Sequence, residues 1–215
     1  MKIIEITGIA GVGKSYIINA LSKRNHFLFD REIIKKYKLN DFKLLIYFFK
    51  IRKSLPMFHA IIKIAFFLNI PLFHKINFIR NSIKKFGKNH FITSHLKENN
   101  NLSIVVDEGI SHLYQNVVSH NKQDNQEIRR LVDKLITYSK IKHQIVVVTA
   151  KDNVVFERLN SRGHRRITSK LEINHFIQMG KDNINALNKK FSKTIQIENN
   201  LENNLELELN KIIGK

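Results

Sequence analysis

The fold is decided by residues 2–22, KIIEITGIAGVGKSYIINALS. The apolar run at 2–7 predicts a short buried strand, and residues 14–23 carry apolar side chains at helical spacing. Between the two, GIAGVGKS at 8–15 fits the pattern G-x-x-x-x-G-K-[ST] at every required position. Because glycine adopts backbone angles that other residues avoid, this segment predicts a tight turn from strand to helix.

The composition of this turn is typical of a phosphate-binding loop. Successive backbone N–H groups can surround phosphate oxygens, and the N-terminus of the next helix adds partial positive charge. We expect Lys14 to reach the β- and γ-phosphates of a nucleotide and Ser15 to bind Mg²⁺. The alternative is an ordinary turn with a chance Lys-Ser, which the flanking strand and helix disfavour. The residues expected at the nucleotide are Gly8, Ile9, Ala10, Gly11, Val12, Gly13, Lys14, Ser15 and Tyr16.

Further apolar runs and helical patterns alternate along the chain. The other predicted strands are Phe27–Phe29, Ser103–Val106, Gln144–Thr149 and Thr194–Ile197. Helices are predicted between them, including Gln126–Lys142 and one that opens at the capping box Ser169-x-x-Glu172. The strands are nearly continuous apolar runs, as in a parallel sheet that is covered on both faces. The predicted fold class is therefore α/β, in a single domain over 1–215.

Residues 33–98 form a predominantly helical insert between the second and third strands. Asp41 is the expected N-cap of its first long helix, which we predict to end at Lys53. Pro56 and Pro71 each suit the first turn of a further helix, and the last helix is predicted to end near Gly87.

The insert also carries most of the excess positive charge. From Arg31 to Glu98 there are fifteen Lys or Arg and three acidic residues, a local charge of +12 in a chain whose net charge is +19. Such a surface attracts nucleotides, nucleic acid or acidic lipid. A biased base composition of the genome is the alternative explanation.

Several function classes are excluded by composition. The chain has no cysteine, so disulfides, Cys-ligated zinc, iron–sulfur clusters and a thiolate nucleophile are ruled out, and a reducing compartment is favoured. The longest charge-free run in the most apolar stretch, Ile64–His74, is shorter than the roughly 20 residues that a spanning helix needs. Glu5 interrupts the N-terminal apolar run, so we expect no signal peptide and a cytoplasmic protein.

Asp107 and Glu108 directly follow the third predicted strand. An apolar strand that ends in an aspartate is typical of the group that holds magnesium beside a phosphate loop, so Asp107 is the candidate. For Glu108 three roles remain open: a general base, a residue that holds the acceptor, or a cap of the following helix.

Arginines gather at residues 157–166, ERLNSRGHRR, in a chain that otherwise prefers lysine. Arg158 and Arg162 lie four residues apart and share one helix face, while Arg165 and Arg166 follow Gly163. Arginine suits bidentate phosphate contacts and the charge of a phosphoryl group in transfer. A solvated basic helix end is the alternative.

With these motifs the chain resembles the nucleoside and nucleotide kinases of the P-loop superfamily, especially the thymidylate-kinase-like and deoxynucleoside-kinase-like group. The matching segments are GIAGVGKS at 8–15, VVDEG at 105–109 and ERLNSRGHRR at 157–166. The last is similar to that group's LID, here 157–169. The resemblance implies a three-layer α/β/α sandwich with a five-stranded parallel sheet of order 2-3-1-4-5, and it puts the insert on the acceptor side.

The resemblance also implies an activity, which is transfer of the γ-phosphoryl group of MgATP to a nucleoside-like, nucleotide-like or carbohydrate acceptor. Ser15 and Asp107 are the implied magnesium ligands, and either Asp30 or Glu108 positions or deprotonates the acceptor. Closure of the LID would exclude water. The implied catalytic residues are Lys14, Asp107, Glu108, Arg158, Arg162, Arg166 and Asp30.

An ATPase coupled to a partner protein or nucleic acid is the main alternative, because water-activating ATPases also carry an Asp-Glu pair. For the basic insert we consider nucleic acid, which the helical spacing of its aromatic residues disfavours, and peripheral contact with an anionic membrane. A homodimer is a further expectation. The ten histidines show no compact metal-ligand spacing.

Overall fold

Five parallel strands form one sheet in the order β2-β3-β1-β4-β5, which confirms the predicted fold and strand order. The computed structural model describes residues 2–24, 26–96, 103–113, 117, 126–139, 143–162, 169–191, 194–200 and 205–213. The strands are β1 (Lys2–Thr7), β2 (Phe27–Phe29), β3 (Ser103–Asp107), β4 (Gln144–Thr149) and β5 (Thr194–Glu198).

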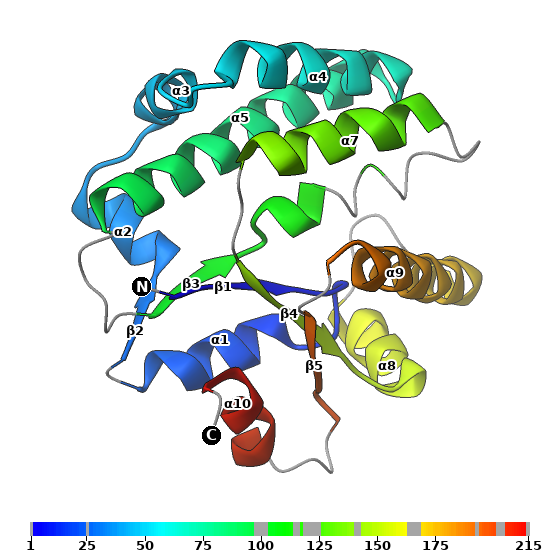
Figure 1. The fold of residues 1–215 in the computed structure, drawn as a ribbon. Helices are drawn as coiled ribbons and strands as arrows, with labels where there is room; N and C mark the ends of the chain where they lie inside the picture. Colours follow the sequence, from blue (N-terminus) through cyan, green and yellow to red (C-terminus); the bar gives the residue numbers. More distant parts are fainter. Residues whose placement is uncertain are drawn as a thin grey trace.

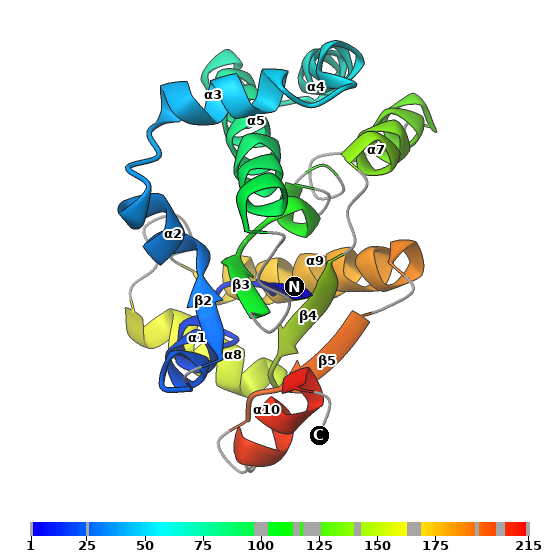
Figure 2. The same cartoon turned by 60° about the vertical axis from the view of Figure 1, so that its left-hand side comes forward.

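Helices lie on both sides of the sheet (Figure 1). They are α1 (Lys14–Ser22), α2 (Asp30–Lys36), α3 (Asp41–Phe49), α4 (Ser54–Phe67), α5 (Leu72–His95), α7 (Gln126–Ser139), α8 (Asp152–Arg162), α9 (Lys170–Lys190) and α10 (Leu205–Ile213). In Figure 1, α1 and α10 lie below the sheet, and α3, α4, α5 and α7 lie above it. Figure 2 shows α5 running from this helical layer down to the edge where β3 ends.

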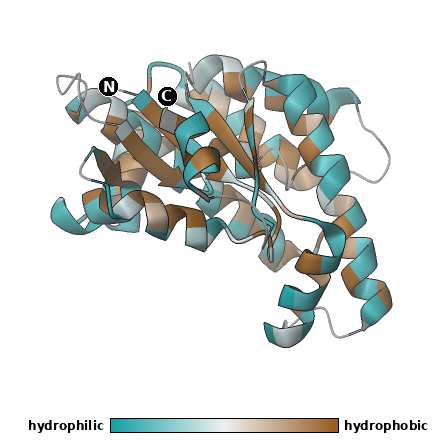
Figure 3. Ribbon diagram, turned by 90° about the horizontal axis from the view of Figure 1, so that it is seen from below, coloured by the Kyte–Doolittle hydropathy of each residue, from teal (hydrophilic) through white to brown (hydrophobic). Residues whose placement is uncertain are grey.

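The core follows from the alternation of side chains along each strand. Ile4 and Ile6 of β1 pack with α1 and α8 on one face, whereas Ile3 packs with α2 and α5 on the other. All three are almost completely buried. The strands are mainly hydrophobic in Figure 3, and the surrounding helices alternate between hydrophobic and hydrophilic residues. Both faces of the sheet are therefore covered, as the continuous apolar runs predicted.

A second apolar cluster lies away from the sheet. Phe48 of α3, Ile61 of α4, Phe86 of α5 and Leu131 of α7 belong to it, and all four side chains are buried. The insert is thus held by its own core together with α7. Among the described residues, no helix combines the length and the hydropathy needed to cross a membrane.

Three predicted helix boundaries are wrong. The first long helix of the insert, α3, ends at Phe49 and not at Lys53, and α4 begins at Ser54. The N-cap of α3 is Asn40, whose Oδ1 accepts a hydrogen bond from the Lys43 amide at 2.9 Å, and Asp41 is already the first helical residue. The last helix of the insert does not end near Gly87 but continues to His95. Gly87 is needed inside α5 because α3 crosses it there: a Cβ atom at this position would lie 2.1 Å from the Leu44 carbonyl oxygen.

This crossing gives a prediction of unusual sign. Gly→Ala inside a helix normally stabilises by about 1 kcal/mol. We expect Gly87→Ala to destabilise the protein by about 1–3 kcal/mol instead, since the new methyl group must push α3 away. Urea unfolding measures the difference. Ser94→Ala, on the exposed side of the same helix, is the control and should change stability by less than about 0.5 kcal/mol; a Gly87→Ala protein as stable as the control would contradict the close crossing.

Candidate functional site

The candidate site lies where β1 and β3 end side by side. Ile6 pairs with Asp107 in the parallel register, and the Glu108 amide donates a hydrogen bond to the Ile6 carbonyl at 3.2 Å. The carboxyl ends of parallel strands meet at one sheet edge, which is where such folds bind ligands. The topology therefore brings Asp107 and Glu108 next to residues 8–15, which we call the glycine loop.

Three glycines give the glycine loop its shape. Gly8, Gly11 and Gly13 have φ values of +150°, +88° and +88°, in the region that L side chains rarely adopt. Space is limiting as well, because a Cβ atom at Gly8 would lie 2.5 Å from the Val148 carbonyl oxygen and one at Gly13 would lie 2.0 Å from Asn199 Nδ2. The loop thus needs glycine at both of these positions for two independent reasons.

The carbonyl groups of the loop are held by side chains from distant elements. Arg158 of α8 donates from Nη1 to the Gly11 carbonyl at 3.2 Å, and Asn199, after β5, donates from Nδ2 to the Val12 carbonyl at 2.8 Å. Arg158 Nη2 also donates to the Asn199 carbonyl at 3.4 Å. Arg158 therefore supports the loop in this structure, and its predicted contact with a γ-phosphate stays a prediction.

Lys14 folds back over the loop that precedes it. Its Nζ donates to the Gly8 carbonyl at 2.6 Å and to the Ile9 carbonyl at 3.3 Å, and lies 3.3 Å from Glu108 Oε1. Lys14 is mostly buried, whereas Ser15 and Tyr16 in the next turn are exposed. The ammonium group thus links the glycine loop to the end of β3.

Asp107 has the properties expected of a ligand for a hard cation. Its Oδ2 accepts from Arg31 Nη2 at 2.6 Å, but its Oδ1 is buried without a hydrogen-bond partner among the described residues. Burial and the negative charge of Glu108 raise the pKa of Asp107, although Arg31 and Lys14 oppose this. An unsatisfied carboxylate oxygen together with the Ser15 hydroxyl fits Mg²⁺, which binds through one or two protein oxygens plus substrate phosphates.

Glu108 is held in a strained backbone conformation with φ of 49°. Burial would raise the pKa of its carboxyl group, but the interactions with His112, Lys14 and Lys85 together lower this pKa below its usual value. His112 Nε2 lies 3.8 Å from the second carboxylate oxygen. Burial and the charge of Lys85 lower the pKa of His112 to about 4, so this imidazole is neutral at pH 7.

Asp30, the acidic residue after β2, already forms an ion pair within the protein. Asp30 is buried and pairs with Lys88 of α5, while its neighbour Arg31 is exposed and pairs with Asp107. The structure thus places Asp30 beside the candidate site, but with its charge already compensated by the insert. A direct role of Asp30 toward an acceptor stays a prediction.

The predicted LID is only partly described. Arg162 is the last residue of α8 and is exposed, and Arg165 and Arg166 lie outside the described residues. The predicted roles of Arg162 and Arg166 therefore stay predictions.

A buried polar network around Glu5 of β1 was not predicted from the sequence. Glu5, in the middle of β1, is 1% exposed, and its carboxylate accepts from the Ser111 amide at 2.7 Å and from the Ser111 hydroxyl. His143 Nδ1 lies 3.4 Å from the other Glu5 oxygen, and His143 Nε2 lies 2.7 Å from Asn89 Oδ1 of α5. Burial alone would raise the pKa of Glu5, but His143, Ser111 and Lys85 lower it below its usual value. A charged residue inside an apolar strand was the available signal.

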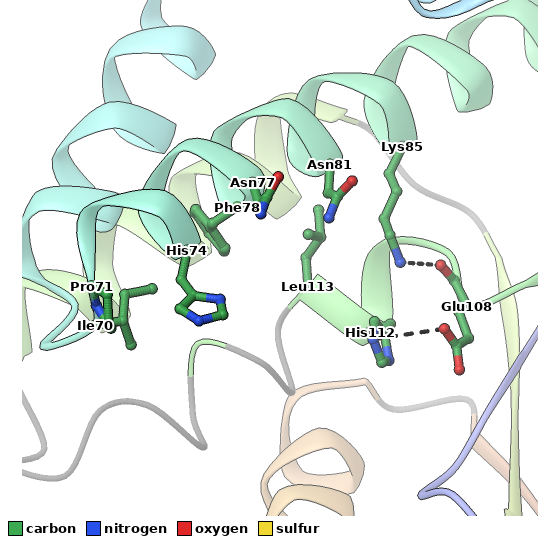
Figure 4. Close-up of a pocket in the computed structure, with 10 residues that line it drawn as sticks. All are labelled: Ile70, Pro71, His74, Asn77, Phe78, Asn81, Lys85, Glu108, His112 and Leu113. Carbon is green, nitrogen blue, oxygen red and sulfur yellow. Dashed lines mark hydrogen bonds and ion pairs between the residues drawn. The ribbon is translucent and has the colours of Figure 1, made fainter. Parts of the chain in front are cut away.

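A cavity of about 730 Å³ opens between α5 and the segment after β3 (Figure 4). From α5, the side chains of His74, Asn81 and Lys85 point toward Glu108 and His112. Lys85 Nζ donates to the Glu108 carbonyl and, at 3.0 Å, to the Gly109 carbonyl. The remaining lining residues are Ile70, Pro71, Asn77, Phe78 and Leu113. Glu108 therefore faces both Lys14 and this cavity.

Comparison with solved structures identifies the fold. A thymidylate kinase from Candida albicans superposes with a TM-score of 0.54 over 99% of this chain and 89% of that one, at 13% identity. The chain therefore has the same fold as this thymidylate kinase. A deoxyadenosine kinase from M. mycoides, determined with bound dATP, matches with a TM-score of 0.47 at 12% identity, over 100% of this chain and 98% of that one. No family model and no curated protein sequence matches the chain.

The Glu5 network gives a stability prediction. Removing the buried Glu5 carboxylate leaves the donors of Ser111 without a partner and the nearby Lys85 ammonium without its compensating charge, so Glu5→Ala should cost about 3–5 kcal/mol in urea unfolding. Asp133→Ala breaks the exposed pair with Lys190 and is the control, with an expected loss below about 1 kcal/mol. Equal losses in the two variants would show that the Glu5 network contributes no more than a surface pair.

His112 gives a prediction for the pH dependence of stability. Its pKa is about 4 in the folded protein against 6.5 for the free side chain, so the unfolded chain takes up the proton first as the pH falls. The folded state should therefore lose stability between pH 6.5 and 4. We expect His112→Gln to flatten this part of the curve of unfolding free energy against pH. A variant whose curve runs parallel to that of the wild type over this range would refute the shifted pKa.

Proposed function

We propose that the protein is an ATP-dependent kinase that transfers the γ-phosphoryl group of ATP to a small-molecule acceptor. The observation that carries this proposal is the position of Glu108. One oxygen of its carboxylate lies 3.3 Å from the Lys14 ammonium, and the same residue lines the cavity of about 730 Å³. A triphosphate on the glycine loop and an acceptor in the cavity would therefore meet at one carboxylate.

The residues divide into three roles in this proposal. The amides of the glycine loop and Lys14 bind the phosphates, as a nest of N–H groups and an ammonium group do in loops of this shape. Ser15 and Asp107 would hold Mg²⁺, which neutralises charge on the phosphates when it is bound. Glu108 would accept the acceptor proton, and Arg162 and Arg166 would act on the transferring group.

An ATPase without a small-molecule acceptor is the second candidate, and the adjacent Asp107 and Glu108 favour it. A reaction with radiolabelled ATP separates the two. Label on an acceptor supports the kinase, whereas release of free phosphate at the same rate with and without every acceptor supports the ATPase.

The other predicted partners stay predictions. Exposed Phe42 and Ile76 flank an apolar hollow between α3 and α5, lined also by Arg80 and Lys84. This surface is compatible with the predicted membrane contact. Binding to nucleic acid and formation of a homodimer are likewise untested.

Lys14→Ala tests the proposed phosphate contact. Loss of the ammonium group should lower phosphoryl transfer by at least about 10²-fold, because electrostatic stabilisation at the reacting phosphate is lost. The initial rate of transfer from labelled ATP measures this effect. Lys23→Ala, at the exposed C-terminal end of the same helix, is the control and should retain the wild-type rate. A Lys14→Ala enzyme of normal activity would overturn the assignment.

Arg162→Ala tests the predicted LID. An arginine that acts on the transferring group should affect the rate of transfer far more than the dissociation constant for ATP, since the charge it neutralises develops only in the transition state. Single-turnover transfer and equilibrium ATP binding provide the two measurements. Equal losses in both would show that Arg162 is only a binding residue.

A further inference from the structure

The cavity beside Glu108 has an electrostatic character that restricts its ligand. Apart from the imidazoles of His74 and His112, only Lys85 and Glu108 among its lining residues carry a formal charge at pH 7. The His112 imidazole is neutral at this pH. Asn77 and Asn81 add amide groups that can both donate and accept hydrogen bonds. Counted over the described lining residues, the cavity is polar but has almost no net charge.

The cations around the end of the cavity at Glu108 already have partners. Lys85 Nζ, largely buried and with a pKa lowered by burial to about 8, donates to the carbonyls of Glu108 and Gly109. Arg31 pairs with Asp107, and Lys88 pairs with Asp30. A phosphate that bound to any of these three groups would therefore share the cation with a carboxylate or with carbonyl groups that it already contacts.

The Ser111 backbone amide, a further donor at this end, is also engaged. The helical residues 110–113 begin directly after Gly109, and a helix N-terminus is a common site for a phosphate. Here the Ser111 amide donates to the buried carboxylate of Glu5 at 2.7 Å. A negative charge that belongs to the protein thus occupies the place where the anion of a ligand would bind.

The remaining groups at this end are the neutral His112 imidazole and the Glu108 carboxylate. The carboxylate repels a phosphate and attracts a hydroxyl proton. We infer that the acceptor presents an uncharged hydroxyl group to the γ-phosphate, and not a phosphate monoester. This inference rests on the proposed kinase function and names the acceptor class for it. The shared chemistry is an alcohol flanked by hydrogen-bonding groups, as found in nucleosides and in sugars.

The step balances with groups already named. The hydroxyl oxygen forms a bond to the γ-phosphorus, and the bond from that phosphorus to the β–γ bridging oxygen breaks. ADP leaves with the electron pair, and the hydroxyl proton passes to the Glu108 carboxylate. The product is a phosphate monoester. Once Glu108 has passed its proton on to solvent, its carboxylate again carries a negative charge and repels the new phosphate group, which favours release.

Matched acceptor pairs test the inference with the full-length protein, magnesium and γ-labelled ATP. The panel contains nucleosides beside their 5′-monophosphates and pentoses and hexoses beside their phosphates. We expect label on at least one hydroxyl compound and at least 100-fold less on its phosphorylated partner. Comparison of the nucleosides with the sugars shows which of these two kinds of hydroxyl compound is the acceptor. Label on no hydroxyl compound, or preferential label on a phosphorylated one, overturns the inference.

The same panel distinguishes failure of the hydroxyl class from failure of the proposed kinase function. Label on monophosphates alone leaves the proposed kinase function intact and removes only the hydroxyl class. Free phosphate released at the same rate with every compound removes the kinase function, and the inference with it.

Glu108→Gln provides a second measurement that does not depend on the best acceptor being in the panel. With a hydroxyl acceptor, loss of the base should lower kcat by about 10²–10⁴-fold while KM changes little. A phosphate acceptor needs no base, and removal of the negative charge should lower its KM instead. Asp133→Asn, an exposed carboxylate-to-amide change on α7, is the control. A Glu108→Gln enzyme with unchanged kcat and lower KM would overturn the inference. Thermal unfolding and a separate measurement of ATP binding show whether this variant is folded.

Discussion

The arrangement of the site depends on one buried carboxylate, that of Glu5 in the central strand. A carboxylate in the interior is tolerated only when hydrogen bonds and opposite charges compensate for the loss of water. Glu5 obtains them from Ser111, after β3, and from His143, before β4, while the charge of Lys85 on α5 adds to them. The requirement of one charge thus ties together four segments that are distant in the sequence. Gly109 is part of the same constraint, since a Cβ atom there would lie 2.6 Å from the Glu5 carboxyl carbon.

Much of the scaffold could be predicted from local patterns because its determinants are local. A glycine turn after an apolar strand, the apolar runs of the other strands and the capping box at Ser169 each act within a few residues, and all appear as expected. The N-cap of α3 is displaced by one residue within a local contact, the hydrogen bond from the Lys43 amide to Asn40. Other errors arose where a contact from elsewhere decides the outcome. A glycine stands inside α5 at Gly87 because α3 crosses there, and this cannot be seen in the sequence around Gly87. Glu5 and Asn199 were missed for the same reason, since their partners are more than a hundred residues away.

Part of the positive charge of the insert forms contacts within the protein. Four basic residues of α5 do not simply face solvent: Arg80 and Lys84 pair with Asp41, Lys85 binds two backbone carbonyls, and Lys88 pairs with Asp30. Two of them, Lys85 and Lys88, fix α5 to the end of β3 and to the end of β2. Part of the local excess of charge therefore serves internal connections, which the total charge alone could not distinguish from attraction to an external polyanion.

The pair of Lys14 and Glu108 links the two halves of the proposed reaction. The Lys14 ammonium contacts loop carbonyls and the Glu108 carboxylate at once, so a triphosphate on the loop would compete with that carboxylate for the same positive charge. To the extent that the triphosphate draws Lys14 away, the carboxylate would lose a nearby cation that lowers its pKa and would become a stronger base. The hydrogen bonds from Lys85 to the carbonyls of Glu108 and Gly109 keep the backbone of this segment in place during this exchange. In this arrangement, nucleotide binding itself would prepare the carboxylate that faces the acceptor.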